Sequence, residues 1–358
     1  MALVINNAAR MGGSERQCLL LATELARRNW TPILLSLAGD GPVLEQARRR
    51  GIETDAVALR FPLSPWYFPR NMFRAWRLFR SIRADVIIGY TSVPNLYIGW
   101  LGRRTGARAF IWSSRNAGLD RPPAWMEQIA LRRADAFIAN SPASRDFLAR
   151  AFPRAVPQTA IIPNGVAIPD LPADTSGQEV VCVANVRPEK DHATLLKAWR
   201  IVKRSRPDAT LRLIGHFEEN TSYTKHIQAL AAVPELMNSV RFSGSTSDIT
   251  TALSNAAIGV LSSRTEGMPN AVLEYMAAGL PVVATDLPGI RLALGDEADQ
   301  WLVPVGHAEM LGVRLLELLQ NNALRASVGG ANRDRAKKEF SIAQMGERTI
   351  SVIRKILQ

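Results

Sequence analysis

The chain of 358 residues has very few cysteines, no long apolar run and no lysine in its first 170 residues. Cys18 and Cys182 both lie in apolar stretches, which excludes a disulfide framework or a cysteine metal cluster and fits a reducing compartment. No apolar run approaches the roughly 18 residues of a membrane-spanning helix, and the first residues lack the features of a secretory signal. We therefore expect a cytoplasmic protein.

Several motifs for nucleotides and metals are also missing. The sequence contains neither a Walker motif nor Gly-x-Gly-x-x-Gly, which counts against simple kinases and dehydrogenases. All four histidines fall in the second half, and no two have the spacing of metal ligands. The sequence therefore predicts no metal site.

The positive charge is concentrated in the first half of the chain. Of the net charge of +12, residues 1–170 contribute +11, from 23 arginines against 12 acidic residues. Such a one-sided field attracts an anionic surface or ligand, such as nucleic acid, phospholipid headgroups or a phosphate-bearing acceptor.

Short apolar runs alternate with helical patterns, which predicts parallel βα units in both halves. Predicted strands lie at 3–5, 32–37, 85–89, 109–112, 136–139, 180–184, 210–214 and 258–261. Proline, aspartate and glycine in residues 168–177 predict a hinge. The expected domains are 1–167 and 178–340, with a last helix at 341–358 that packs back on the first domain.

Two glutamates, Glu266 and Glu274, stand eight residues apart in a strand-loop-helix segment. The first falls in the loop after a predicted strand and the second in the helical run 271–278. Ligands of open α/β folds bind at this edge, where helix N-termini attract phosphates and carboxylates accept hydrogen bonds from hydroxyls. Taken alone, the spacing favours the other interpretation, two glutamates on a solvated helix face.

The whole segment Arg264 to Asp286, RTEGMPNAVLEYMAAGLPVVATD, closely resembles the signature of glycosyltransferase family 4. Further segments follow in family order, including MGGSER at 11–16 and IPNGV at 162–166. The resemblance implies an α/β protein with two Rossmann-like, doubly wound domains facing across a cleft (GT-B). It also implies a retaining hexosyltransferase.

The resemblance further implies roles for single residues. Glu266 is expected to contact the donor sugar and Glu274 the ribose hydroxyls. The expected donor-binding set is Gly12, Gly13, Gly215, Gly267, Met268, Pro269, Asn270 and Glu274. The donor substrate is a nucleoside-diphosphate sugar, with UDP expected over GDP, and no cofactor is expected. Because Asp-x-Asp is absent, the transferase is expected to work without a metal.

Two cations, Arg187 and Lys190, follow the strand predicted at 180–184. A guanidinium and an ammonium group together neutralise a diphosphate and stabilise the charge that grows on the leaving phosphate. Lys190 matches the family lysine, whereas the family arginine position holds Asn185, so Arg187 is expected to substitute for it. With Glu266, they form the predicted catalytic set.

The first half departs from the family at a sugar-contacting histidine, where this chain reads WSSRNAG at 112–118. Arg115 or Asn116 is expected to contact the acceptor or the sugar, and an ordinary surface arginine is the alternative. Gly12 and Gly13 lie between a strand and a helix, where they serve either ligand approach or a tight turn. A second departure is Leu292, where relatives carry a glutamate.

The stretch 60–83 holds six arginines, seven aromatic residues and no acidic residue. A helix from Arg70 puts Arg70, Arg74 and Arg77 on one face and apolar residues largely on the other. This pattern suits an anionic membrane surface, and it equally suits a helix packed on a sheet with its arginines in water.

We expect a retaining glycosyltransferase that acts on a glycan or lipid-linked acceptor in cell-surface polysaccharide or glycolipid biosynthesis. It is expected to lie peripherally on the inner face of the cytoplasmic membrane and not to bind nucleic acid. A sugar-nucleotide epimerase of the same architecture is one alternative, but the first half offers no evident acid and base set. A basic nucleic-acid-binding protein is another, which leaves the donor signature unexplained.

Overall fold

The computed structural model describes residues 1–9, 11–60, 66–115, 125–246 and 248–358. The chain divides into two compact units. Unit 1 comprises Met1–Gly165 with Ile342–Gln358, and unit 2 comprises Val166–Ser341. Among the described residues, no helix is both long and apolar enough to cross a bilayer.

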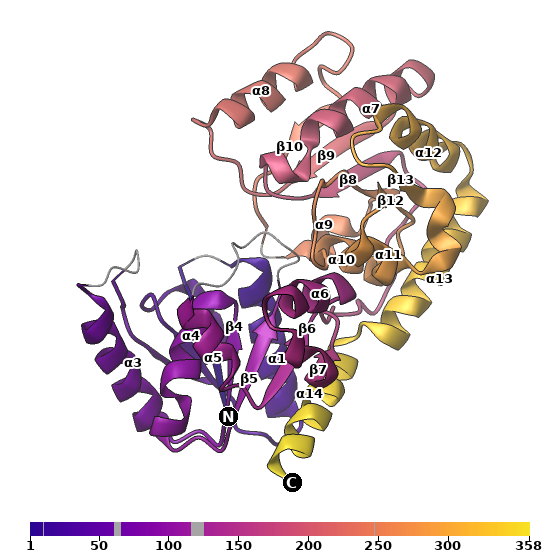
Figure 1. The fold of residues 1–358 in the computed structure, drawn as a ribbon. Coiled ribbons are helices and arrows are strands. Elements are labelled where there is room, and N and C mark those ends of the chain that lie inside the picture. Colours follow the sequence, from indigo (N-terminus) through magenta and orange to yellow (C-terminus); the bar gives the residue numbers. More distant parts are fainter. Residues whose placement is uncertain (10, 61–65, 116–124, 247) are drawn as a thin grey trace. The chain divides into compact units, whose positions relative to one another are not determined.

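Unit 1 is built on a parallel sheet of seven strands in the order β3-β2-β1-β4-β5-β6-β7. Figure 1 labels β4, β5, β6 and β7 of this sheet. Its strands are β1 (Ala2–Ile5), β2 (Ile33–Ser36), β3 (Glu53–Ala56), β4 (Val86–Tyr90), β5 (Ala109–Ser114), β6 (Ala136–Ala139) and β7 (Thr159–Ile161). Its helices are α1 (Gly13–Arg27), α2 (Pro42–Arg49), α3 (Phe68–Ile82), α4 (Ser92–Leu101), α5 (Trp125–Leu131), α6 (Pro142–Ala151) and α14 (Ile342–Leu357). The order reverses between β1 and β4, as in a doubly wound fold.

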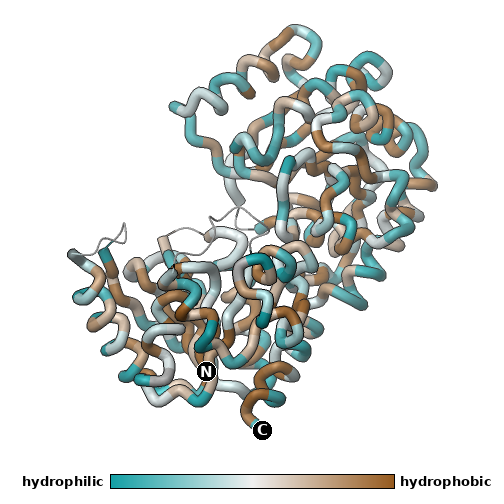
Figure 2. Tube along the Cα trace, in the orientation of Figure 1, coloured by the Kyte–Doolittle hydropathy of each residue, from teal (hydrophilic) through white to brown (hydrophobic). Residues whose placement is uncertain are grey.

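Both faces of this sheet are buried, which explains why its central strands read as continuous apolar runs. In β1, Leu3 and Ile5 pack with α1, α2 and α14, whereas Ala2 and Val4 pack with α3, α4 and α5. Figure 2 shows the same pattern, with hydrophobic colours inside and hydrophilic colours over much of the outer surface. Helix α14 contributes Met345, Ile350 and Ile353 to the core of unit 1, beside α1.

Unit 2 has a parallel six-stranded sheet in the order β10-β9-β8-β11-β12-β13. Its strands are β8 (Glu179–Val183), β9 (Thr210–Ile214), β10 (Val240–Phe242), β11 (Ile258–Leu261), β12 (Val282–Thr285) and β13 (Leu302–Val303). Its helices are α7 (His192–Ser205), α8 (Ser222–Ala231), α9 (Ile249–Leu253), α10 (Asn270–Ala278), α11 (Pro288–Leu294), α12 (Ala308–Gln320) and α13 (Asn322–Glu339). Here the strand order reverses between β8 and β11.

The segment 168–177 belongs to unit 2, so its prediction as a hinge is wrong. Ala173 N donates to Ala278 O at 2.8 Å, and Asp174 N donates to Ser254 O at 2.7 Å. The Arg333 guanidinium donates to the carbonyls of Pro169 and Asp170. Its turn-rich composition does predict irregular backbone, but buried arginines from α13 satisfy that backbone and hold it on the unit.

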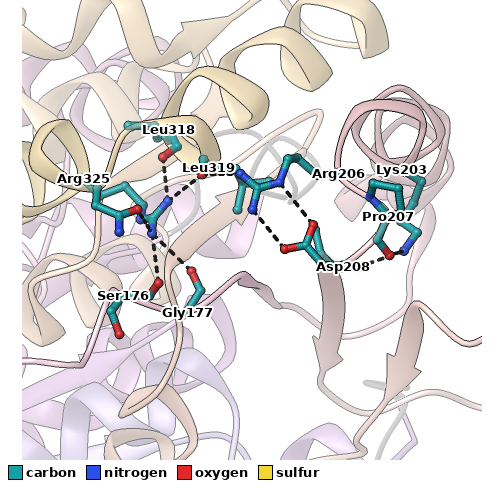
Figure 3. A network of polar contacts seen from close by, with 11 residues as sticks. Ser176, Gly177, Lys203, Arg206, Pro207, Asp208, Leu318, Leu319 and Arg325 are labelled. Atoms are coloured by element: carbon teal, nitrogen blue, oxygen red, sulfur yellow. Dashed lines mark hydrogen bonds and ion pairs between the residues drawn. The ribbon is translucent and has the colours of Figure 1, made fainter.

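Arg325 on α13 fastens the end of the same segment (Figure 3). Its side chain is fully buried and donates to Leu318 O and Leu319 O, both at 2.9 Å, at the C-terminus of α12. It also donates to the carbonyls of 175, 176 and 177 at 3.0, 3.3 and 3.2 Å. One guanidinium therefore joins the end of α12 to the chain that enters β8.

Helix α3 places most of its apolar side chains against the sheet of unit 1. Ala75, Leu78 and Phe79 are buried there, with Met72, Trp76 and Ile82 packed beside them. Its arginine face is exposed, as is Phe73 on the same side. The core-packing interpretation thus holds for the apolar face, while the arginine face stays available to solvent or a ligand. Of the stretch 60–83, residues 61–65 lie outside the described ranges.

Candidate active site

The strand reversal of unit 2 brings two predicted site residues together. Lys190 ends a short 3₁₀ helix, Pro188–Lys190, that follows β8, and Glu266 lies in the loop between β11 and α10. Since β8 and β11 are adjacent parallel strands, both loops leave the same edge of the sheet. Ligands of open α/β sheets bind at such a switch point.

Lys190 and Glu266 form an ion pair at this edge. Lys190 Nζ lies 2.5 Å from Glu266 Oε1, and the Ser263 hydroxyl donates to the same oxygen at 2.6 Å. The Lys190 side chain is 25% exposed and that of Glu266 is 10% exposed. A partly desolvated ammonium group fixed in this way is positioned to meet a phosphate, and the carboxylate is positioned to accept hydrogen bonds from hydroxyls.

Two hydroxyls fix the backbone around this pair. Ser262 Oγ donates to Lys190 O and Asp191 O, both at 3.0 Å, which ties the β8 loop to the β11 loop. Thr285 Oγ1 at the end of β12 donates to Ser263 O at 2.6 Å. The position of Glu266 therefore depends on hydroxyls from two neighbouring strands, which the sequence reasoning did not single out.

Asp191 connects the pair to α7. Its backbone is left-handed (φ 47°), a conformation that non-glycine residues rarely adopt, and its side chain caps α7 by accepting from Thr194 N. The same carboxylate forms an ion pair with Arg264, with Arg264 Nε 3.0 Å from Asp191 Oδ2. Arg264 N also donates to Glu189 O at 2.8 Å. These contacts hold the loop between β11 and α10, which carries Glu266, against the loop after β8, which carries Lys190.

His192, the first residue of α7, is fully buried, and neither ring nitrogen has a hydrogen-bond partner of good geometry among the described residues. Burial, with a smaller contribution from the Lys190 charge, lowers the pKa of His192 to about 4. The imidazole is therefore neutral at pH 7 and belongs to the support of the site.

We expect this burial to make unit 2 sensitive to acid. The pKa of His192 is lower in the folded protein than in the unfolded chain, so its contribution to stability is complete above the unfolded pKa of about 6.5 and declines as the pH falls towards 4. The loss between pH 7 and pH 4.5 is on the order of 2 kcal/mol. Thermal unfolding of wild type and His192→Leu at both pH values checks this. The exposed His226→Asn is the control, and an equal drop in Tm for all three proteins would contradict it.

The residues after Glu266 form a buried turn into α10. Gly267 and Met268 are buried, and a Cβ on Gly289 would lie 1.9 Å from Gly267 O, so the turn packs on the start of α11. Asn270 begins α10, and Glu274, 7% exposed, stands one turn later on the same face. Pro269 is the N-cap residue.

Arg187 does not join the ion pair in this structure. It is the N-cap of the 3₁₀ helix, its side chain is 56% exposed, and its guanidinium lies 4.0 Å from the Glu189 carboxylate. Asn185, at the family arginine position, instead accepts from His216 N at 3.0 Å. The neighbouring Gly215 permits a close approach of the backbone, since a Cβ there would lie 2.2 Å from Ala184 O.

In unit 1, Gly12 and Gly13 begin α1, with Gly12 as its N-cap. The Glu15 carboxylate folds back over them, so that a Cβ on Gly12 would lie 2.5 Å from Glu15 Oε2. Burial raises the pKa of Glu15, although hydrogen bonds from its own N–H, from Ser14 and from Gly12 oppose the shift. A side chain at position 12 would therefore clash with the Glu15 carboxylate, which explains the glycine there without a ligand.

Arg115 follows β5 and is half-buried, and its contact with the acceptor or the sugar stays a prediction. It contacts Ser113, Asn164 and the ring of Tyr90. Asn116 lies outside the described residues. Leu292 packs on the core of unit 2.

In the part of the chain that the structure describes, no group of three or more His, Cys, Asp or Glu side chains is arranged to hold a metal ion.

Two family models together match most of the chain. The model described as Glycosyltransferase Family 4 matches residues 11–168, and the one described as Glycosyl transferases group 1 matches residues 177–321. An uncharacterized glycosyltransferase of Haemophilus influenzae is 24% identical over 322 residues, 89% of each chain. A GDP-mannose-dependent monoacylated alpha-(1-6)-phosphatidylinositol monomannoside mannosyltransferase of Corynebacterium glutamicum is 28% identical over 216 residues, which is 54% of this chain and 55% of that one.

Solved structures agree with the fold. HepE of Anabaena, crystallised with UDP and glucose, matches with a TM-score of 0.85 and 17% identity over 99% of both chains. Sucrose-phosphate synthase of Thermosynechococcus elongatus matches with a TM-score of 0.78 and 19% identity over 99% of this chain and 98% of that one. The two Rossmann-like units are those of the GT-B fold. With a matching family model in each half, the chain belongs to the group 1 glycosyltransferases of the family 4 type.

Proposed function

We propose that this glycosyltransferase moves a sugar from a nucleoside-diphosphate donor, UDP rather than GDP, to a hydroxyl of a glycan or lipid-linked acceptor, with retention and without a metal ion. We assign the donor to unit 2 and the acceptor to unit 1. Cell-surface polysaccharide or glycolipid biosynthesis is the context that we propose. The epimerase and nucleic-acid alternatives are not favoured, because both matching family models describe glycosyl transferases.

The ion pair between Lys190 and Glu266 at the strand reversal carries this proposal. In the proposed reaction, the bond from the anomeric carbon to the diphosphate oxygen breaks, and a bond to the acceptor oxygen forms on the same face of the sugar. The leaving phosphate takes the acceptor proton. Lys190 stabilises the charge that develops on that phosphate, Glu266 accepts hydrogen bonds from the sugar, and Glu274 accepts them from the ribose. Arg187 is exposed and can turn towards the diphosphate.

The choice of donor has partial support from similar proteins. HepE was crystallised with UDP-glucose as well as with UDP and glucose, whereas the mannosyltransferase relative is named for GDP-mannose. A screen of UDP- and GDP-sugars for slow donor hydrolysis by the full chain tests the proposal, because it needs no acceptor. Hydrolysis of a nucleotide sugar supports it, and failure to hydrolyse any of them contradicts it.

We expect full activity after exhaustive treatment with a chelator. Lys190 supplies the positive charge that a divalent ion would otherwise place on the donor diphosphate. Donor hydrolysis is measured before and after treatment with EDTA and gel filtration, and again after addition of magnesium or manganese. Strict dependence on the added ion would overturn the metal-free part of the proposal.

The surface of α3 supports an acceptor at an anionic membrane. Arg70, Arg74 and Arg77 are exposed along it, and Trp66 and Phe73 are 90% and 56% exposed beside them. No acidic residue lies on the helix. Basic side chains with exposed aromatics are the composition of surfaces that bind anionic lipid reversibly.

We expect the protein to sediment with vesicles that contain phosphatidylglycerol, and to do so less as salt is added. Each arginine near such a surface contributes about 1 kcal/mol, so the triple variant Arg70, Arg74 and Arg77→Gln should bind on the order of a hundredfold more weakly. The control, Lys338, Arg354 and Lys355→Gln, removes the same charge from exposed positions elsewhere. Equal binding by both triple variants, or no preference for anionic over neutral vesicles, would end the membrane proposal.

A further inference from the structure

A half-buried arginine stands at the strand reversal of unit 1. Arg115 directly follows β5, and Tyr90 ends the neighbouring strand β4, which lies beside β1 where the strand order reverses. The register pairs Tyr90 with Ser113 at the carboxyl ends of β4 and β5, and Arg115 lies two residues beyond Ser113, at the same edge of the sheet. This edge is where open α/β sheets bind their ligands.

The contacts of Arg115 with described residues are to neutral groups. Its Nε donates to Ser113 Oγ at 3.2 Å, and one Nη donates to Asn164 Oδ1 at 2.8 Å. Its guanidinium carbon lies 4.3 Å from the centre of the Tyr90 ring, a cation–π contact. A guanidinium has five N–H donors, so these two hydrogen bonds leave it with further capacity.

No carboxylate of the described residues forms an ion pair with Arg115. Glu15, whose charge like that of Arg115 acts on the buried Cys18, is hydrogen-bonded to Ser14 Oγ at 3.1 Å. Arginines that are withdrawn from water are normally paired with an anion. Among the described residues, Arg115 therefore contacts the Tyr90 ring and the Asn164 amide oxygen and has no carboxylate as a counter-ion.

Tyr90 adds a second unsatisfied group. The residue is 1% exposed, and its hydroxyl has no hydrogen-bond partner of good geometry among the described residues. Burial, only partly opposed by the Arg115 charge, raises the pKa of Tyr90. The hydroxyl is thus a neutral O–H, which can donate to an anion. The neighbouring Arg115 guanidinium can only donate, so the buried Tyr90 O–H has no acceptor among the described residues and calls for one.

We propose that Arg115 and Tyr90 bind an oxyanion on the acceptor, a phosphate or a carboxylate group. The guanidinium offers its planar N–H groups to two oxygens, and the Tyr90 hydroxyl offers a further donor. This inference rests on the proposed function, because it names the chemistry of the acceptor that unit 1 receives. It makes Arg115 a specificity-determining residue for acidic acceptors.

The test uses the full chain with Lys190→Ala as background, so that the proposed phosphate contact in unit 2 is removed. The probes are glycerol 3-phosphate and, in a separate arm, glucuronate, with ionic strength held constant by chloride. Binding is followed by the NMR signal of the Arg115 Nε–H, assigned by its loss in Arg115→Gln. Tyr90→Phe and Arg115→Lys are measured in parallel. Arg145→Gln is the control, because Arg145 forms an ion pair with Asp146 at the surface.

We expect saturable binding of at least one probe, a shift of the Arg115 signal and at least about a tenfold weaker Kd in Arg115→Gln. Tyr90→Phe should weaken binding severalfold, Arg115→Lys should not restore it, and Arg145→Gln should leave it unchanged. The probe that binds more tightly identifies phosphate or carboxylate as the source. Absence of saturation by both probes, or equal Kd values with and without Arg115, overturns the inference. Donor hydrolysis by wild type is measured separately, so failure of the proposed function is distinguishable.

Discussion

Replacement of Lys190 by alanine is expected to lower sugar transfer at least about a hundredfold while the protein stays folded. The Lys190 side chain is 25% exposed and its ammonium group is held 2.5 Å from Glu266, so its loss removes the main positive charge that faces the leaving phosphate in the proposed reaction. A hundredfold is the typical effect of removing one group that stabilises transition-state charge. Donor hydrolysis and transfer rates measure it, with circular dichroism as the check on folding.

The control is Lys197→Ala, an exposed lysine one and a half turns into α7 from the site. It should keep wild-type activity. Glu266→Ala should show a loss similar to that of Lys190→Ala, and the double variant should lose much less than the product of the two, because paired groups are not additive. Wild-type rates in Lys190→Ala and Glu266→Ala would refute the assignment of the site.

Replacement of Arg325 by alanine is expected to destabilise unit 2 by about 3–5 kcal/mol, because several buried carbonyls lose a charged hydrogen-bond donor and each such bond contributes about 1.5–3 kcal/mol. The change removes the donor to the carbonyls of 175, 176 and 177, while Leu318 O still accepts from Asn321 N and Leu319 O from Arg206 (Figure 3). Arg325→Lys should recover only part of the loss, because an ammonium group cannot reach both segments as the planar fork does. Urea denaturation of the three proteins measures the free energy of unfolding.

The matched comparison is Arg200→Ala on α7. Arg200 forms an exposed ion pair with Glu235 at 2.9 Å, and such pairs contribute about 0–1 kcal/mol. A loss below about 1 kcal/mol in Arg325→Ala would show that the backbone at 175–177 finds water or other donors once the guanidinium is gone.

The central strands were predictable because they are buried on both faces. Strands β6, β9 and β11 lie where the apolar runs predicted them. Edge strands lack this signal: β3 reads ETDA, with exposed and half-buried residues in turn, and was not predicted. Strand β12 was not predicted either, because its residues lie inside the family signature at 264–286. The hinge at 168–177 was predicted wrongly because turn composition says nothing about Arg325 and Arg333, which lie at least 148 residues away in the sequence and bind its carbonyls.

The site was predictable where a residue type carries a direct chemical role. Lys190 and Glu266 are 76 residues apart in the sequence, which predicts both as site residues, and the structure brings them into contact. Their supports were not named, because a serine such as Ser262 or a left-handed Asp191 gives no signal without the fold. The pairing of Tyr90 with Arg115 also depends on strand register, which only the folded sheet supplies.

Titration of the full chain with UDP and with GDP, in the presence of EDTA, tests the central claim most directly. The claim is that Lys190, Glu266 and Glu274 form a metal-free site for a nucleoside diphosphate in unit 2. We predict saturable binding of UDP by isothermal calorimetry, at least about tenfold weaker in Lys190→Ala and in Glu274→Ala, and unchanged in Lys197→Ala. No binding of either nucleotide, or equal affinity in wild type and Lys190→Ala, would contradict the account.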